Sequence, residues 1–347
     1  MITFYPGPSK IYPKVATYVR EGLESGIISM NHRSSEFMAL MDDTKKLLKH
    51  RLNIPEEYRI IFTSSATECW EILAQSLIKE KSLHFYNGAF GKKWMDYTSK
   101  LGLEVQDQQF DLEGLPQISN ATVDLVCFTQ NETSNGTQVP AQFISDFTSS
   151  ENLIAMDATS SMAGIDLDFS KADIWFASVQ KCFGLPSGMA LMILSSKAVL
   201  RAYEIDERNH YNSLAFILDN EANNQTPYTP NILNIFLLNC LLKDLPKIDE
   251  VNKLTLSRYS RWVDFFSNTK RFGLLIKNDE VRSKTVLTVI YDSDLNELKQ
   301  KAKQAGIVLG NGYGKWKETS FRIANFPAIA KGEIEELMEF LSSQDTK

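Results

Sequence analysis

The chain has 347 residues and a formal net charge of −6, and 43% of its residues are hydrophobic and 23% charged. These proportions are typical of a folded globular protein with one large and one smaller domain, and they exclude a disordered or fibrous chain. The negative charge offers no long-range attraction to a nucleic-acid backbone and no window resembles a membrane span, so we expect a cytoplasmic protein that binds neither nucleic acid nor membrane.

Short β-type runs alternate with helical runs from about residue 59 to residue 195. This alternation predicts an α/β fold with a seven-stranded, mostly parallel sheet covered by helices. The expected strands are RIIFTSS (59–65), SLHFYNG (82–88), LEVQDQQF (103–110), DLVCFTQ (124–130), NLIAMDAT (152–159), DIWFASV (173–179) and MALMILS (189–195). Only QKCFGLPSG joins the last two, which is too short for a helical crossover, so we expect that pair to be antiparallel.

Helical spacing of apolar residues, with Gly or Pro at the boundaries, predicts helices at 67–80, 91–102 and 140–150. After about residue 225 the pattern becomes two long helices followed by strand, helix, strand and helix, at 231–245, 248–268, 284–292, 294–306, 320–326 and 331–343. The prolines of NNQTPYTPN indicate a connecting loop near this change. We expect a large domain of residues 15–228 and a small α/β domain formed by residues 1–14 and 229–347.

The cysteines and histidines show no metal-ligand spacing. The four cysteines are far apart and read as reduced, mostly buried thiols: Cys69, Cys127, Cys182 and Cys240. His32 lies in a different segment from the other three histidines. We therefore expect no metal site.

Lys181 stands at the end of an apolar run, directly before a glycine-containing turn. By itself such a lysine is usually solvated, but an amine in low-dielectric surroundings can attack an aldehyde. Neighbouring strand ends also carry polar residues, namely Ser64, Ser65, Thr67, Thr133 and Asp157. Each could be only a cap, an Asx turn or a loop residue. Together, at the carboxyl edge of one sheet, a phosphate cradle, an amine and an acid are what pyridoxal phosphate requires.

The motifs around these residues resemble the class-V group of fold-type I, pyridoxal phosphate-dependent aminotransferases. The block DATSSMAGIDLDFSKADIWFASVQKCFGLPSG is similar to the group's continuous stretch from the cofactor aspartate to the Gln-Lys pair. The segments FYPGPSKIYP, ISMNHRSSEF, QNETSNG, QTPYT and FRIANFPA follow in the family order, from end to end of the chain. Within the group, the phosphoserine aminotransferases are the most similar.

The resemblance implies a role for each matching residue around the cofactor. Lys181 would hold it through a Schiff base and carry the proton during transfer, and Asp157 would pair with the ring nitrogen. Phe90 stands where the family places a stacked aromatic ring, usually tryptophan in phosphoserine aminotransferases, and Thr133 would bind the phenolic oxygen. The phosphate would be held by Ser65, Ala66, Thr67 and Gln180, with Gln225 and Thr226 reaching it from the second subunit of a homodimer with shared active sites.

For the substrate, the resemblance implies that Arg322 grips the α-carboxylate and that His32 and Arg33 contribute to the distal acidic group across the dimer. Phosphoserine aminotransferases usually carry a second His-Arg pair before the strand of that arginine. This chain reads GNGYGKWKETSFR there, leaving Lys315 and Lys317 as candidate distal-group ligands.

The expected activity is transamination between amino and keto acids. The leading prediction is the interconversion of 3-phosphoserine plus 2-oxoglutarate with 3-phosphohydroxypyruvate plus glutamate, by a ping-pong mechanism in serine biosynthesis. Phe90 and the absent second His-Arg pair leave an alanine– or serine–glyoxylate transaminase as the alternative. A cysteine desulfurase would need a cysteine on a mobile loop, which Cys182 does not match, and a non-catalytic binding protein is the alternative from another class.

Overall fold

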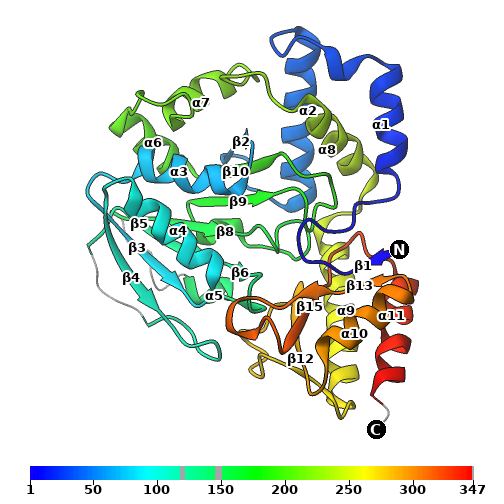
Figure 1. The fold of residues 1–347 in the computed structure, drawn as a ribbon. Coiled ribbons are helices and arrows are strands. Elements are labelled where there is room, and N and C mark those ends of the chain that lie inside the picture. The colour runs from blue at the N-terminus through cyan, green and yellow to red at the C-terminus, as the bar shows by residue number, and fades with distance from the viewer. Residues whose placement is uncertain (118–121, 145–150, 346–347) are drawn as a thin grey trace.

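The structure is a computed structural model that describes residues 1–117, 122–144 and 151–345 (Figure 1). Its centre is a seven-stranded sheet in the order β2-β10-β9-β8-β5-β3-β4. These strands are β2 (Arg59–Thr63), β3 (Lys81–Tyr86), β4 (Glu104–Gln109), β5 (Leu125–Thr129), β8 (Leu153–Asp157), β9 (Ile174–Ser178) and β10 (Ala190–Leu194). All seven expected strands are present, and the predicted fold class is confirmed.

Strand direction decides where the loops of this sheet meet. β10 is antiparallel to β9, as the short connection predicts, and also to β2, whereas the other neighbouring pairs are parallel. Every strand except β10 therefore ends at the same edge of the sheet. Loops that follow those strands are brought together there, which is where open α/β sheets bind ligands.

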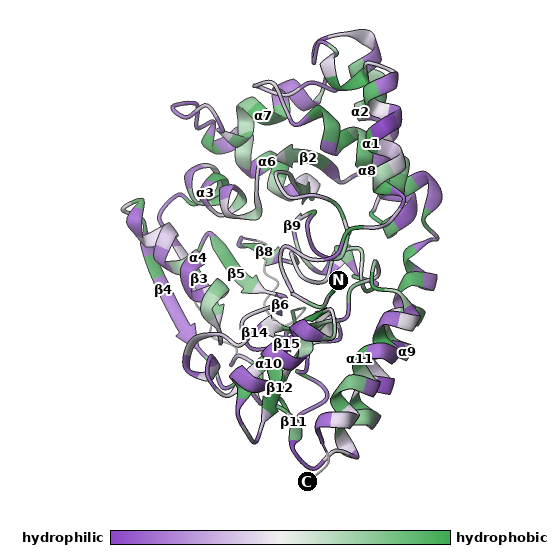
Figure 2. Cartoon of the chain, turned by 45° about the vertical axis from the view of Figure 1, so that its right-hand side comes forward, coloured by the Kyte–Doolittle hydropathy of each residue, from purple (hydrophilic) through white to green (hydrophobic). Residues whose placement is uncertain are grey.

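Helices cover both faces of the sheet, so its central strands are buried along their whole length. Val126 and Phe128 of β5 face one apolar cluster, and Leu125 and Cys127 face the other. The edge strand β4 is polar instead, and in Figure 2 it is largely purple whereas β5 is green. Polar side chains on an edge strand discourage pairing with other chains.

Several helices in this first part of the chain begin at a residue whose side chain caps them, among them α2, α3, α6 and α8. Ser65 accepts a hydrogen bond from the Glu68 N–H and so starts a helix directly after β2. The helices are α1 (Val15–Glu24), η1 (Ile27–Ser29), α2 (Ser35–Leu52), α3 (Ala66–Leu77), α4 (Ala89–Lys100), α5 (Ala141–Ile144), η3 (Phe169–Lys171), α6 (Ser196–Ile205), α7 (Leu214–Glu221) and α8 (Ile232–Asp244). Of the helix expected at 140–150, the part beyond residue 144 lies outside the described residues.

The C-terminal part forms a second sheet, in the order β11-β12-β15-β14, with a core of its own. Its elements are α9 (Ile248–Ser267), β11 (Phe272–Leu274), β12 (Val286–Tyr291), α10 (Leu295–Gln304), β13 (Ile307–Val308), β14 (Gly310–Asn311), η4 (Gly314–Trp316), β15 (Ser320–Ala324) and α11 (Lys331–Gln344). The N-terminal strand β1 (Ile2–Thr3) pairs with β13, which places the start of the chain beside this second core (Figure 1).

Two further features bear on the expectations. Ile235 and Leu238 of α8 pack in a cluster with the large sheet, and Trp262 of α9 packs in the C-terminal core. The domain limits at residues 14 and 228 stay a prediction. None of the helices in the described ranges is both long and apolar enough to cross a bilayer.

Candidate active site

Lys181 lies beyond the end of β9, at the carboxyl edge of the large sheet. Its Nζ donates hydrogen bonds to Thr133 Oγ1 at 2.9 Å and to Ser160 Oγ at 3.1 Å. The side chain is buried, and burial lowers the pKa of the amine to about 8, against the opposing effect of the Asp157 charge. The lowered pKa gives this amine a larger neutral fraction near neutral pH than an ordinary lysine has, and so the capacity to act as nucleophile and as base.

Asp157 is the last residue of β8, the neighbouring strand. Its Oδ1 accepts the Thr159 N–H at 3.0 Å, and its Oδ2 accepts the indole N–H of Trp70, on α3, at 3.2 Å. Burial raises the pKa of this carboxyl, while these hydrogen bonds favour the charged form. A buried carboxylate at the base of a cavity is suited to pair with a protonated ring nitrogen.

Two cavities meet at Lys181. The inner one, of about 240 Å³, is lined by Asp157 and by the first turn of α3. The outer one, of about 420 Å³, is lined by Arg322 and by residues of the N-terminal segment. Phe90, Thr133 and Lys181 line both. A group attached at Lys181 can therefore occupy the inner cavity while a second molecule approaches through the outer one.

Buried polar atoms without partners show what the inner cavity would hold. Thr129 Oγ1 and Asn131 Nδ2 line it, and neither has a hydrogen-bond partner within the described part of the chain. Unpaired buried polar atoms cost free energy unless a ligand or water satisfies them. Donors of this kind, an acid, an amine and a helix N-terminus at Thr67 fit the ring, aldehyde and phosphate of pyridoxal phosphate.

Glu132 holds the segment that carries Phe90. Its Oε2 accepts the N–H groups of Phe90 at 3.0 Å and Gly91 at 3.1 Å, while its Oε1 accepts the N–H and hydroxyl of Ser134. A Cβ on Gly88 would stand 2.3 Å from Glu132 Cγ, so only glycine allows this approach. The Phe90 ring consequently lies 5.3 Å from Lys181 Nζ, at the junction of the two cavities.

Arg322 projects from β15 into the outer cavity. It is 5% exposed, and its guanidinium donates to the backbone carbonyls of Asn311 and Thr133, both at 2.6 Å. Neither partner is a carboxylate, so the positive charge is oriented without being neutralised. The centre of the Tyr313 ring lies 5.6 Å from the guanidinium carbon, within the range of a cation–π contact.

Comparison with known proteins identifies the family to which the chain belongs. The model of the aminotransferase class-V family matches residues 3–313. The chain belongs to the class-V aminotransferase family. The resemblance read from the sequence is thereby confirmed, together with the enzyme class and pyridoxal phosphate as its cofactor.

Individual relatives of this aminotransferase are similar over its whole length. The phosphoserine aminotransferase of Rhodococcus opacus (strain B4) is 28% identical over 346 residues, which is 95% of this chain and 91% of that protein. The solved structure of a phosphoserine aminotransferase from Cytophaga hutchinsonii ATCC 33406 has a TM-score of 0.94 at 31% identity and covers 99% of both chains. A pyridoxal phosphate-bound phosphoserine aminotransferase from Trichomonas vaginalis shares the fold, with a TM-score of 0.82, 18% identity and coverage of 98% and 99%.

Three of the predicted phosphate ligands of the aminotransferase, Ser65, Ala66 and Thr67, lie at the start of α3, and Gln180 follows β9. Thr67 and Gln180 line the inner cavity. Ala66 lines the same cavity, and its N–H donates to Ser178 Oγ at 2.9 Å, so its role toward the phosphate stays a prediction. The Ser65 side chain caps α3 and does not line this cavity.

The structure separates the two lysines proposed for the distal group. Lys317 lines the outer cavity, where it is exposed. Lys315 instead stacks over the Trp316 ring at 4.7 Å and lines neither cavity. The residue spacing alone could not distinguish them, because both lie in or beside the short helix η4.

Four predicted site residues form a separate group. Arg33 Nη1 donates to Gln225 Oε1 at 2.9 Å, and His32 Nδ1 lies 3.4 Å from Thr229 Oγ1. Thr226 donates to the Tyr228 carbonyl. None of the four lines the two cavities at Lys181.

The remaining sequence expectations concern cysteine and metal. Cys182 Sγ contacts the Ser160 carbonyl at 3.2 Å, and burial raises the pKa of its thiol, which makes it a poor nucleophile. Cys69, Cys127 and Cys240 also have raised thiol pKa values. In the described ranges, no group of three or more potential ligands is arranged for a metal ion.

Sequence reasoning missed several residues that contact the reacting centre. Ser160 accepts a hydrogen bond from Lys181, and Trp70 donates one to Asp157. Gly7 lies so close to Lys181 that a Cβ on Gly7 would stand 2.9 Å from Lys181 Cε. The position of Ser160 directly after the β8 strand end was a usable signal. Nothing local in the sequence indicates that Gly7 lies beside a lysine far along the chain.

Proposed function

We propose that this class-V aminotransferase interconverts 3-phosphoserine plus 2-oxoglutarate with 3-phosphohydroxypyruvate plus glutamate, as a cytoplasmic enzyme of serine biosynthesis. The observation that carries the proposal is the outer cavity, where Arg322 and Lys317 offer positive charge beside Lys181. Relatives named phosphoserine aminotransferase, aligned over almost the whole chain, support the choice of substrate.

Bound pyridoxal phosphate supplies an aldehyde that takes the amino group and a ring that accepts the electron pair left at the α-carbon. Around it, Asp157 would pair with the ring nitrogen and keep it protonated, and Phe90 would pack against the ring. In the first half-reaction, Lys181 Nζ removes the proton from the α-carbon of the amino acid. In the second half-reaction, it delivers a proton to the α-carbon derived from the keto acid. Its pKa of about 8 suits both directions of proton transfer.

The substrate is held by charge. Arg322 binds the α-carboxylate with its guanidinium, which the Asn311 and Thr133 carbonyls orient. Lys317 attracts the distal phosphate from the cavity rim, and His32 and Arg33 of a second copy of the chain complete its binding. Gln225 and Thr226 of that copy likewise reach the cofactor phosphate, so the proposed working unit is a homodimer.

The test is the first half-reaction of the enzyme loaded with pyridoxal phosphate. It is run with phosphoserine, serine and alanine in turn, and it is monitored through the visible absorbance of the cofactor. Since loss of charge-assisted bonds to phosphate costs about 1.5–3 kcal/mol each, we expect kcat/KM for phosphoserine to exceed that for serine by about 100-fold or more. Lys317→Ala should raise KM for phosphoserine more than Lys315→Ala does. An absorbance that phosphoserine leaves unchanged would reject this substrate.

Two features of the sequence favour a second candidate. Phe90 replaces the tryptophan usual in phosphoserine aminotransferases, and residues 310–319 contain no histidine or arginine. These features suit an alanine– or serine–glyoxylate transaminase. If alanine or serine rapidly changes the cofactor absorbance in the same experiment, and glyoxylate then accepts the amino group, that function is established instead.

A further inference from the structure

The loop between β11 and β12, residues 275–285, joins the C-terminal sheet to the active-site edge of the large sheet. It lies against the hairpin formed by β6 (Asn131–Glu132) and β7 (Thr137–Gln138). The Gln138 N–H donates to the Val281 carbonyl at 2.8 Å, and the Ser283 N–H donates to the Gly136 carbonyl at 2.9 Å. The β11–β12 loop therefore extends the hairpin that carries Thr133.

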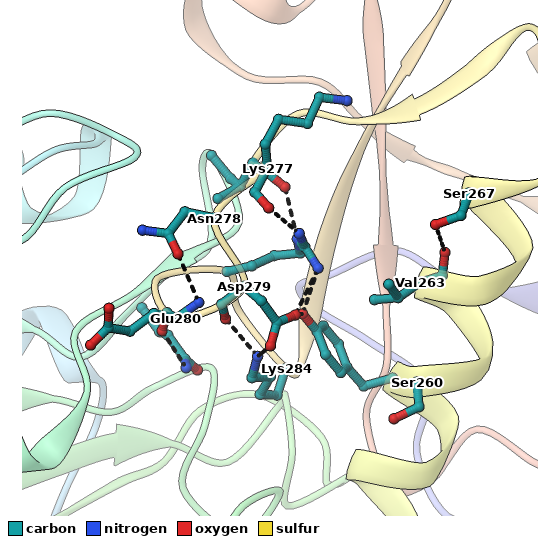
Figure 3. A network of polar contacts seen from close by, with 12 residues as sticks. Ser260, Val263, Ser267, Lys277, Asn278, Asp279, Glu280 and Lys284 are labelled. Carbon is teal, nitrogen blue, oxygen red and sulfur yellow. Dashed lines mark hydrogen bonds and ion pairs between the residues drawn. The ribbon is translucent and has the colours of Figure 1, made fainter.

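Polar contacts fix the other side of the loop to α9. The Asp279 carboxylate accepts from Arg282 at 2.9 Å and from Lys284 at 3.1 Å, and Tyr259 of α9 donates to the same carboxylate. Lys284 Nζ also lies 4.1 Å from the centre of the Tyr259 ring. Figure 3 shows Asp279 and Lys284 in this network beside α9. Anchored on both sides, the loop can hold a side chain in one position.

The hydrogen bonds around the Ser283 hydroxyl leave it only one role toward Asn131, that of donor. Its Oγ accepts the N–H groups of Thr285 at 3.2 Å and Val286 at 2.9 Å, which occupies both lone pairs. The hydroxyl proton is left to donate, and Asn131 Oδ1 lies 2.6 Å away. Ser283 thus determines which end of the Asn131 amide is the oxygen.

The consequence lies in the inner cavity. With Oδ1 held by Ser283, the Nδ2 of Asn131 faces the cavity, and it is buried without a partner among the described residues. The side chain is only 3% exposed. A buried N–H donor in this position requires an acceptor from the bound group.

A second contact from the same loop acts on Ser160. Thr285 Oγ1 donates to the Ser160 carbonyl at 2.6 Å, and Ser160 Oγ accepts from Lys181 Nζ. One loop therefore touches both the Asn131 amide and the turn that supports the lysine.

We propose that Asn131 is a cofactor-binding residue whose Nδ2 donates a hydrogen bond to an oxygen of bound pyridoxal phosphate, and that Ser283 is the positioning residue that orients it. The inference rests on the cofactor of the proposed function and not on its substrate. A hydrogen-bond donor at a cofactor oxygen stabilises the deprotonated form of the bound cofactor. Loss of the donor therefore raises the pH at which the bound cofactor titrates.

The experiment measures cofactor affinity by equilibrium dialysis and the pH midpoint of the bound cofactor's visible absorption. Because one hydrogen bond to a charged group is lost, Asn131→Leu should weaken affinity about 10-fold and raise the midpoint by about half a unit or more. Asn131→Asp, which keeps an acceptor for Ser283 but has no N–H, should shift both in the same direction. Ser283→Ala should produce a smaller shift of the same sign, about 3-fold in affinity.

The control is Thr288→Val on β12, which removes a buried hydroxyl that has no partner in the described part of the chain and should leave both quantities unchanged. If Ser283 acts through Asn131, adding Ser283→Ala to Asn131→Leu should cause no further shift in the midpoint. Additive shifts, or a Ser283→Ala protein that melts earlier with its midpoint unchanged, would overturn the positioning role. A wild-type midpoint in Asn131→Leu would overturn the whole proposal, whereas an enzyme that binds cofactor but ignores phosphoserine would overturn only the substrate assignment.

Discussion

Opposing electrostatic effects set the pKa of Lys181, and they come from residues far apart in the chain. Burial lowers the pKa of the amine, the negative charge of Asp157 raises it, and the positive charge of Arg322 lowers it again. Hydrogen bonds to Thr133 and Ser160 orient the amine toward the shared boundary of the two cavities. The result is an amine with a larger neutral fraction near neutral pH than an ordinary lysine has, and its Nζ lies at the boundary of the two cavities.

This balance predicts the pH dependence of cofactor capture by the cofactor-free protein. Only the neutral amine attacks an aldehyde, so the capture rate should rise with pH and level off above about pH 8, the pKa given by burial, and not near the ordinary lysine value. Asp157→Asn removes a charge that raises this pKa, and the midpoint should therefore move to lower pH. Stopped-flow absorbance across pH 6–10, on the order of ten points, resolves the two profiles.

Asp42→Asn is the matched control, because Asp42 is an acid on the exposed side of α2, paired with Lys46. It should leave the profile in place. A wild-type midpoint near that of a solvated lysine, or one that Asp157→Asn does not move, would contradict the electrostatic account.

At the scale of elements, the β6–β7 hairpin is the part that organises the site. Asn131, Glu132 and Thr133 are consecutive, and they face a cofactor cavity, the start of α4, and Lys181 respectively. Gly136 closes the hairpin with φ of +80°, and a Cβ there would stand 2.9 Å from Thr288 Oγ1. The tight turn lets the hairpin lie between the large sheet and β12.

Glu132 provides a test of this element. Glu132→Ala leaves the Phe90 and Gly91 N–H groups without their acceptor in a buried place, so we expect a loss of about 3 kcal/mol in the free energy of unfolding and weaker cofactor binding. Glu132→Gln should cost less, because one oxygen remains to accept. Urea unfolding followed by circular dichroism measures the first quantity, and fluorescence titration with pyridoxal phosphate measures the second. Glu104→Ala, on the exposed edge strand β4, should change neither, and an equally mild Glu132→Ala would show that this carboxylate does not hold the hairpin.

The sequence predicts the long elements well because their information is local. Short β-type runs, apolar in all but the edge strand β4, identified the seven strands of the large sheet, and a short connection identified the antiparallel pair. The hairpin strands β6 and β7 have two residues each, too few to show an alternating pattern. The partnership of Ser283 with Asn131, 152 residues apart in the chain, depends on how the two sheets meet, which no local pattern records.

At the scale of the whole molecule, the two ends of the chain complete the site together. The N-terminal segment pairs with β13 and brings Tyr5 and Gly7 into the outer cavity, opposite Arg322. One chain nevertheless leaves the Arg33–Gln225 group away from both cavities. If these residues serve a site, as proposed, that site belongs to a second copy related by two-fold symmetry.

Complementation tests this arrangement. Lys181→Ala lacks the reacting amine, and Arg33→Ala lacks the proposed phosphate ligand, so each homodimer should be nearly inactive with phosphoserine. In a heterodimer, both substitutions lie in one site and the other site is wild-type. Random assembly of an equal mixture makes about half of the dimers heterodimers, so about a quarter of wild-type activity should be recovered. Phosphoserine turnover after the two variants are unfolded and refolded together measures the recovery, and the same variants refolded separately and then mixed are the control. If Arg33 acted within its own chain, both heterodimer sites would stay defective, and co-refolding would restore no more activity than simple mixing.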